Sequence, residues 1–217
     1  MRGYMSRSDI LLDELLKRYP VLEKCREDIW TAFKMMCSSY ESDGKLLIAG
    51  NGGSASDANH MVGELMKGFL KQRSPDDEQR RRLMETDAEL GKELCSKLQL
   101  ALPAIAMTEH VSLNTAYLND VDGILGFAQQ VYGYGKQGDI MLGITTSGNS
   151  RNILYAAVAA RAKGLKVIAL TGMTGGRLKR YADVTIAVPE TEAYKIQELH
   201  LPVYHALCLM LEEYFFD

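Results

Sequence analysis

The sequence predicts an α/β protein, a three-layer α/β/α sandwich with a five-stranded parallel sheet, preceded by an N-terminal helical pair. Short runs of apolar, β-branched residues alternate with longer stretches that have helical periodicity. These runs are apolar along their whole length, which is typical of parallel strands covered on both faces. The 217 residues fit one domain, so we expect a single unit over 1–217.

Residues 1–43 contain the predicted N-terminal helices. Apolar side chains recur at helical spacing over 8–42, and Pro20 interrupts the pattern. Ser8 is the expected cap of the first helix. The apolar stripe must be buried against something, and a partner subunit is one candidate, so this pair is a candidate oligomer interface.

The predicted sheet follows from five short apolar runs that each end at a turn or polar loop. The strands are expected at residues 45–50, 103–107, 139–144, 166–171 and 183–188. Helical segments are expected between and after them, at residues 54–70, 110–120, 124–133, 150–163 and 193–215. Strands that are separated by helices indicate a parallel sheet, and the crossovers are expected to be right-handed.

Residues 71–100 break this rhythm. The segment is highly charged and helix-prone, and it stands where a short connection would suffice. We interpret it as a helical insertion, either a lid or an interface element. The run Arg80–Arg82 could meet a phosphate, although a solvated helix face is the favoured interpretation.

The composition argues against several classes of protein, among them nucleic-acid-binding and membrane-spanning proteins. Hydrophobic residues make up 47% and charged residues 24%, and the net charge is −3, so no basic surplus indicates a nucleic-acid partner. No apolar run approaches the roughly 20 residues of a membrane span. Acidic residues interrupt the N-terminal segment where a signal peptide would be apolar, so we expect a cytoplasmic protein. Four scattered cysteines indicate reduced thiols.

Two hydroxyl-rich loops each follow a predicted strand and open a helix. Ligands bind at such strand ends, where glycines allow close approach and helix starts attract anions. The candidate binding residues in these loops are Asn51, Gly52, Gly53, Ser54, Thr145, Thr146, Ser147 and Ser150. Without a dinucleotide-binding glycine motif or a phosphate-binding loop lysine, they predict a phosphate cradle and no nucleotide cofactor. The alternative is that these residues only build turns.

Two further patterns carry candidate chemistry. His60 and Glu64 are four residues apart, on one face of the helix that starts at the first loop. Glu64 is suited to remove a proton, and His60 to assist it or to bind a metal, although a surface pair or a core histidine is the alternative. In the last helix, Gln197 and His205 differ by eight residues, about 12 Å of rise and about 80° of rotation.

Gln197 and His205 therefore cannot easily meet at one point from a straight helix. Either Pro202 bends this helix or the two residues serve different copies of the site in an oligomer. His200, close to Gln197 in the sequence, is interpreted as an interface or core polar residue.

These motifs together resemble a known family. The segments GNGGS, His60-x-x-x-Glu64, TTSGNS and IQELHLPVYH resemble the sugar isomerase (SIS) domain and, more closely, the phosphoheptose isomerases, over nearly the whole chain. The resemblance implies the SIS fold and an enzyme that interconverts sedoheptulose 7-phosphate and D-glycero-D-manno-heptose 7-phosphate. This aldose–ketose exchange proceeds by base-catalysed proton transfer through an enediol.

The resemblance also implies roles for single residues. Phosphate binding is implied for Ser54, Thr145, Ser147 and Ser150, and substrate contacts for Thr146, Gln197 and Asp120. Glu64 matches the base and His205 its acid/base partner. In some members one zinc ion per subunit is held at the positions of His60, Glu64, Gln197 and His205. The family forms homotetramers with sites between subunits.

The chain departs from the family pattern in ways that keep alternatives open. Thr145 replaces a serine, and residues 65–69 lack an arginine that contacts substrate, for which Lys67 is a candidate replacement. Together with the 71–100 insertion, this leaves an isomerase of another sugar phosphate open. A non-catalytic SIS protein, which binds the replication initiator or senses sugar phosphates, is the other alternative. The presence of His60, Glu64 and His205 favours the enzyme.

Overall fold

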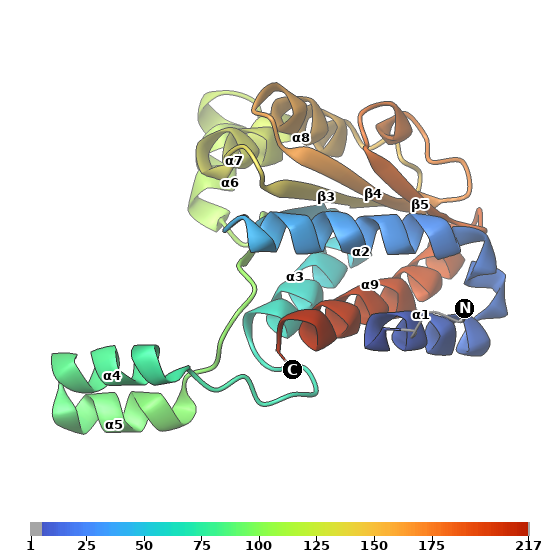
Figure 1. Cartoon of the computed structure of the whole chain (residues 1–217). Coiled ribbons are helices and arrows are strands. Elements are labelled where there is room, and N and C mark those ends of the chain that lie inside the picture. The colour runs from blue at the N-terminus through green and yellow to red at the C-terminus, as the bar shows by residue number, and fades with distance from the viewer. Residues whose placement is uncertain (1–5, 217) are drawn as a thin grey trace.

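The computed structural model describes residues 6–216, which form an α/β/α sandwich around one parallel sheet (Figure 1). The strands are β1 (Leu46–Gly50), β2 (Ala104–Ala106), β3 (Ile140–Thr145), β4 (Lys166–Gly172) and β5 (Val184–Val188). Their order is β2-β1-β3-β4-β5, and every neighbouring pair is parallel. The predicted fold class and all five predicted strands are confirmed.

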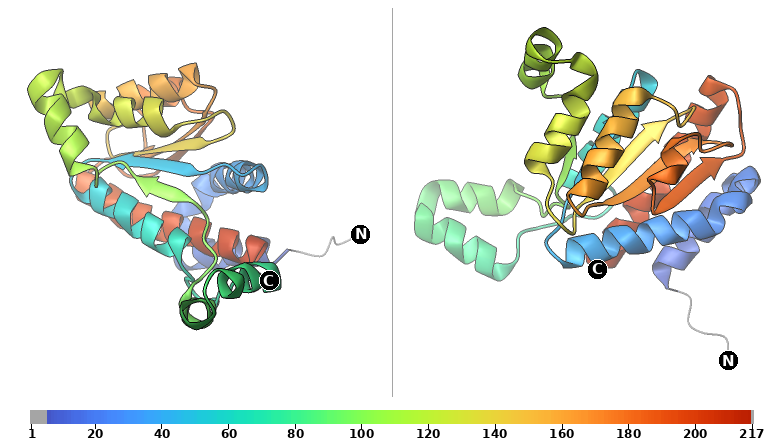
Figure 2. Two further views of the ribbon diagram at one scale, coloured as in Figure 1. Left: turned by 90° about the vertical axis from the view of Figure 1, so that its left-hand side faces the viewer. Right: turned by 90° about the horizontal axis from the view of Figure 1, so that it is seen from above.

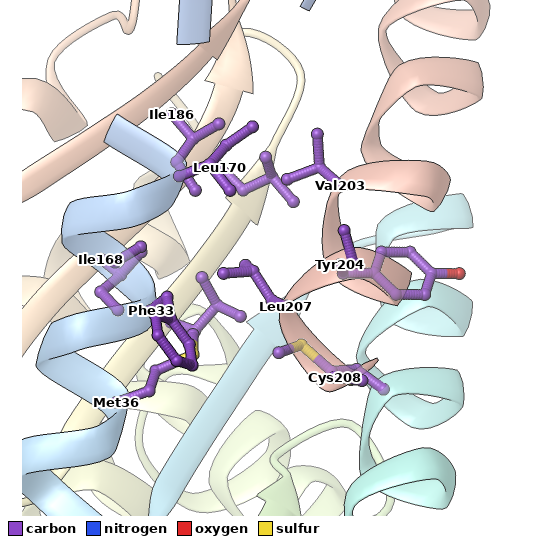
Figure 3. Close-up of a cluster of buried hydrophobic side chains, with 14 of the residues drawn as sticks. Phe33, Met36, Ile168, Leu170, Ile186, Val203, Tyr204, Leu207 and Cys208 are labelled. Atoms are coloured by element: carbon purple, nitrogen blue, oxygen red, sulfur yellow. The ribbon is translucent and has the colours of Figure 1, made fainter. Parts of the chain in front are cut away.

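Helices cover both faces of the sheet (Figure 2). One face carries α1 (Arg7–Arg18), α2 (Arg26–Glu41), α3 (Gly53–Met66) and α9 (Ala193–Phe215). The other carries α7 (Gly126–Tyr134) and α8 (Arg151–Ala162). Alternate strand residues serve the two layers, so Ile168 and Leu170 pack towards α2 and α9 (Figure 3). Val167 belongs to the core cluster on the other face, which also contains residues of α7 and α8.

The N-terminal helices correct one prediction. Ser6, not Ser8, caps α1, because the Ser6 side chain accepts from the Asp9 amide while Asp9 accepts from the Ser6 amide. Ser8 lies inside the helix, buried, and its Oγ donates to the Met210 carbonyl 3.3 Å away. The helix thus starts where the reciprocal capping pair is available.

The interruption at Pro20 is confirmed, since a 3₁₀ helix, η1 (Pro20–Cys25), separates α1 from α2. The apolar stripe of the pair is buried within the chain. Leu15, Ile29 and Phe33 belong to the core cluster that also contains residues of α9 and the sheet. Burial of this stripe therefore needs no partner subunit.

The predicted insertion is a helical hairpin that projects from the body (Figures 1 and 2). It consists of α4 (Asp77–Thr86) and α5 (Ala88–Lys97), whose only buried residue is Gly91. Arg81 and Arg82 pair with Glu78 one turn earlier, and both are more than half exposed. The interpretation of this arginine run as a solvated face is confirmed.

The remaining elements are α6 (Val111–Asp120), η2 (Gly123–Leu125) and η3 (Leu178–Arg180). No helix in the described part of the chain combines the length and hydrophobicity needed to cross a bilayer. All four cysteines are free, in line with the prediction of reduced thiols.

Candidate active site

The two hydroxyl-rich loops meet, as predicted. They follow β1 and β3, which are adjacent parallel strands, so their ends lie at the same edge of the sheet. A small pocket there is lined by Asn51, Ser54, Ile144, Thr145, Thr146, Ser150 and Gln197. We call this the cradle. Ser54 and Thr145 are buried, and the Thr145 and Ser150 hydroxyls lie 3.0 Å apart, so the hydroxyl groups are held close together.

Two glycine residues and a pair of asparagine side chains explain how the loops fit together. Gly52 has a φ of 56°, a left-handed conformation that glycine adopts without strain. A Cβ on Gly53 would lie 2.6 Å from Gln197 Nε2, so glycine leaves room for the Gln197 amide beside the start of α3. Asn51 and Asn152 exchange side-chain hydrogen bonds of 3.0 and 2.7 Å and tie the two loops together. Sequence reasoning missed Asn152, although it lies just beyond the TTSGNS motif.

Two predicted substrate contacts lie outside the cradle. Ser147 is exposed in the second loop, where its Oγ accepts from the Asn149 amide 3.1 Å away and shapes the turn. Asp120 is the last residue of α6, exposed, and its carboxylate accepts from the Asn119 side chain. Asp120 is not among the residues that line the cradle within one chain, and its contact with substrate stays a prediction.

A second cluster forms on α3 and α9. His60 Nε2 lies 3.3 Å from Glu64 Oε1 and 3.4 Å from His205 Nε2. Lys67 Nζ lies 3.0 Å from the other carboxylate oxygen of Glu64, so the candidate arginine replacement binds the predicted base. The Glu64 side chain is 14% exposed, whereas that of His60 is 44% exposed. The cluster is open enough for a ligand and holds an acid/base set.

The two helices run side by side in the same direction, because Gly53 meets Gln197 at one end and His60 meets His205 further along. Gln197 and His205 therefore do not converge, as their spacing predicted. Pro202 lies inside α9, which is one continuous helix over Ala193–Phe215. The two residues serve opposite ends of a seam between α3 and α9 within one chain.

Sequence reasoning missed two residues behind His60. The Tyr204 hydroxyl donates to Asp57 Oδ1 at 3.4 Å and lies 3.1 Å from His60 Nδ1. Burial raises the pKa of Asp57, an effect that the hydrogen bond from Tyr204 opposes. Burial and the neighbouring carboxylate also raise the pKa of Tyr204. The available signals were that Asp57 is one helical turn before His60 and that Tyr204 precedes His205.

The environment of His205 favours its neutral form. Burial lowers its pKa, and the charge of His60 lowers it further. The imidazole and phenol rings of His60, Tyr204 and His205 meet edge to face, with centroids 4.8 to 5.6 Å apart. A neutral imidazole can donate from one nitrogen and accept at the other, which suits proton exchange at sugar oxygens.

The four side chains assigned to zinc by resemblance do not surround one point. His60, Glu64 and His205 are neighbours, but Gln197 lies at the cradle. Among residues 6–216, no group of three or more His, Cys, Asp or Glu side chains has an arrangement that could hold a metal ion. This arrangement does not fit zinc, and the chemistry below is derived from the side chains alone. Zinc binding stays a prediction.

Two buried side chains, Arg73 and His200, lie near the elements that carry the site. Arg73 is fully buried and pairs with Glu212 at 2.9 Å, and its guanidinium also donates to the carbonyls of Leu65 and Glu64. It thereby caps the end of the helix that carries the predicted base. His200 is fully buried. This agrees with the second of its two interpretations, an interface residue or a core polar residue. Arg73 gave no signal in the sequence, because Glu212 is 139 residues away.

Comparisons with known proteins agree with this geometry. The model of the SIS domain family matches residues 82–172. A phosphoheptose isomerase of Nitratiruptor sp. is 36% identical over 206 residues, which cover 93% of this chain and 96% of the relative. One from Helicobacter pylori is 33% identical, covering 95% and 96%.

Solved structures give the same result. The structure of a phosphoheptose isomerase from Neisseria gonorrhoeae matches with a TM-score of 0.72 and 32% identity, covering 95% of this chain and 97% of that one. One from Francisella tularensis matches with a TM-score of 0.69 and 33% identity, covering 95% and 92%. The fold, the paired clusters along α3 and α9 and this similarity lead to one conclusion: the chain belongs to the phosphoheptose isomerase family of SIS-domain proteins.

Proposed function

We propose that this protein is an aldose–ketose isomerase that interconverts sedoheptulose 7-phosphate and D-glycero-D-manno-heptose 7-phosphate. The observation that carries the proposal is the pairing of two clusters along one seam. The cradle contains Ser54 and Gln197, and the acid/base cluster contains Glu64 and His205. Ten residues separate Ser54 from Glu64, about 15 Å of helix rise, so the phosphate-binding and reacting ends of the site are well apart.

The acid/base cluster supplies the groups that isomerisation needs. Glu64, held by Lys67, removes the proton from carbon 2 of the aldose, and the carbonyl oxygen gains a proton to give an enediol. Glu64 then returns its proton to carbon 1 while the carbon 2 hydroxyl loses its own, which forms the ketose. His205, beside His60, exchanges the protons of the two oxygens. Each proton taken from the sugar is thus given back.

The cradle supplies binding energy at the far end of the sugar. Hydroxyl groups and the start of α3 attract the phosphate, which is remote from the carbons that react. Binding there orients the sugar along the seam and leaves Glu64 to act on one carbon. A compound with its phosphate close to the carbonyl would not reach both ends.

The assembly forms part of this proposal, and zinc binding stays a prediction. We infer a homotetramer with sites between subunits, because apolar side chains around the seam are exposed, among them Ile10, Met66, Leu70 and Leu201. In such an assembly the α6 segment of another copy would bring an Asp120 to the site. Light scattering coupled to size exclusion tests the tetramer, and activity after chelation and after zinc addition tests the metal.

Proton NMR of the protein with sedoheptulose 7-phosphate in D₂O tests the proposal. We expect a new heptose anomeric signal, with deuterium entering at carbon 2 because the proton that Glu64 removes exchanges with solvent before it is returned. The folded protein giving no new signal, with and without zinc, would overturn the assigned substrate. A parallel assay with six-carbon and amino-sugar phosphates would then decide between another isomerase and a binding protein.

A further inference from the structure

Tyr204 stands apart from the residues that the proposed reaction uses. Its residue exposure is 1%, and its ring leaves α9 on the side of α3 with the hydroxyl directed away from Val203 and Leu170 (Figure 3). The hydroxyl reaches Asp57 Oδ1 at 3.4 Å and His60 Nδ1 at 3.1 Å. A buried phenol with two polar neighbours on another helix is more than core packing requires.

The hydrogen count at this hydroxyl fixes the direction of both contacts. A phenol has one hydrogen to donate, and an ionised carboxylate can only accept. The Tyr204 hydrogen therefore goes to Asp57, and the Tyr204 oxygen must accept from His60 Nδ1–H. A neutral imidazole that carries its hydrogen on Nδ1 has an unprotonated Nε2.

That second nitrogen faces the reacting groups. His60 Nε2 lies 3.3 Å from Glu64 Oε1 and 3.4 Å from His205 Nε2. With Nε2 unprotonated, His205 is the donor in the contact between the two rings. The His205 hydrogen then occupies the single lone pair of His60 Nε2, and Glu64 Oε1 is left as the acceptor to which an incoming sugar hydroxyl can donate.

We propose that Tyr204 is a positioning residue of this site, which with Asp57 holds His60 in the tautomer that presents an unprotonated Nε2 to Glu64 and His205. The expected effect of Tyr204 on turnover rests on the proposed function, whereas the expected tautomer of His60 does not. The hydrogen bond made by one ring nitrogen of a histidine sets the protonation of the other nitrogen, and at metal-binding histidines the loss of such a bond typically costs about 10- to 100-fold in activity. The tautomer itself is a property of the protein without substrate.

The first measurement is a long-range ¹H–¹⁵N correlation spectrum of histidine-labelled protein at about pH 8, where an unperturbed imidazole is neutral. The chain has four histidines, so signals are assigned by replacing the other three in turn. We expect the Nδ1–H tautomer for His60 in the wild type. Tyr204→Phe should give a mixture of tautomers. Asp57→Ala should shift His60 towards Nε2–H, because the freed Tyr204 hydrogen can turn to Nδ1.

The second measurement is steady-state kinetics. We expect Tyr204→Phe to lower kcat about tenfold with KM changed less than about twofold, since the cradle is untouched. Tyr40→Phe is the matched control, because Tyr40 is also buried and donates one 3.3 Å hydrogen bond, to the Pro103 carbonyl. It should leave both the tautomer and kcat unchanged.

The inference is overturned if His60 carries its hydrogen on Nε2 in the wild type, or if Tyr204→Phe keeps the wild-type tautomer and kcat. Equal losses of kcat in both phenylalanine variants would also overturn it, since they would indicate a general effect of losing a buried hydroxyl. If Tyr204→Phe does not fold, the Asp57→Ala spectrum decides. A protein inactive on sedoheptulose 7-phosphate that keeps the expected tautomers would refute the proposed substrate and leave the positioning role intact.

Discussion

The α3–α9 seam and the α4–α5 hairpin are both pairs of packed helices, but they are stabilised in opposite ways. In the seam, Met61, Tyr204 and Cys208 are almost fully inaccessible. In the hairpin, only Gly91 is buried, and Leu90 is 60% exposed. Burial of one large apolar side chain contributes about 1.5–3 kcal/mol, whereas an exposed ion pair within a helix contributes about 0.2–0.5 kcal/mol.

The hairpin relies on local interactions. Asp76 caps α4 through a reciprocal pair with Gln79, Asp87 caps α5, and Arg81 pairs within one turn. Such contacts specify helices without fixing side chains in relation to the rest of the chain. The seam instead holds Glu64 and His205 within hydrogen-bonding distance of His60. The comparison teaches that the proposed chemistry lies where burial, and not local propensity, sets side-chain positions.

The largest difference should appear when one carboxylate is neutralised in each region. Glu64→Gln in the seam should lower kcat by about 10²- to 10⁴-fold, because it removes the proposed base. Glu93→Gln, which breaks the hairpin pair with Lys97, should leave kcat unchanged. Coupled enzyme assays measure both, and retained stabilisation of Glu64→Gln by inorganic phosphate in thermal melts would show an intact cradle. Normal turnover by Glu64→Gln would exclude it as the base.

Breaking one ion pair in each region should lower the free energy of unfolding by very different amounts. Arg73→Met leaves the Glu212 carboxylate buried without its cation, a change that typically costs about 3–5 kcal/mol. Arg81→Met removes exposed pairs and should cost less than about 1 kcal/mol. Urea unfolding gives both values. Equal losses would mean that the hairpin is as firmly packed as the body.

Acid should weaken the seam through His200. Burial lowers the pKa of this histidine from 6.5 to about 4, so between these values the folded chain binds fewer protons than the unfolded chain. The free energy of unfolding should therefore be maximal above about pH 6.5 and fall by up to about 3 kcal/mol towards pH 4.

His200→Leu tests this pH dependence, since neither His200 nitrogen has a hydrogen-bond partner of ordinary geometry. Unfolding measured across this range should have a shallower slope in the leucine variant. Tyr40→Phe, a buried substitution that removes no group titrating in this pH range, is the control and should keep the wild-type slope. A leucine variant with an unchanged slope would mean that other groups cause the acid loss.

The smallest effect should follow removal of the hairpin. Replacing residues 77–97 with two glycines should change the free energy of unfolding by less than about 1 kcal/mol, because these residues bury almost nothing. The Arg73–Glu212 ion pair lies outside the deleted residues and should keep the base of the hairpin attached to α9. Differential scanning calorimetry with a turnover assay measures the outcome. A large loss of stability in the assembled protein would reveal contacts of the hairpin with another copy.

Local pattern predicted most of the fold. The apolar run Lys166–Thr171 indicated a buried strand. The break in the N-terminal helix at Pro20 was predicted because proline has no backbone amide hydrogen to donate. Element ends were less certain. Ser8 was chosen as a cap where Ser6 forms the capping pair, and the helix expected over 54–70 ends at Met66, where Lys67 turns extended. Alternative caps two residues apart differ too little in energy for sequence alone to decide between them.

The sequence by itself determined the strands, the two polar loops and the placement of His60 and Glu64 on one helix face, because spacing within one strand or helix sets which residues share a face. Only the tertiary structure decided which helices meet. The parallel packing of α3 on α9 separated Gln197 from His205 and joined Tyr204 to Asp57, 147 residues away in the chain. Such contacts depend on how distant segments pack, and no local periodicity records that.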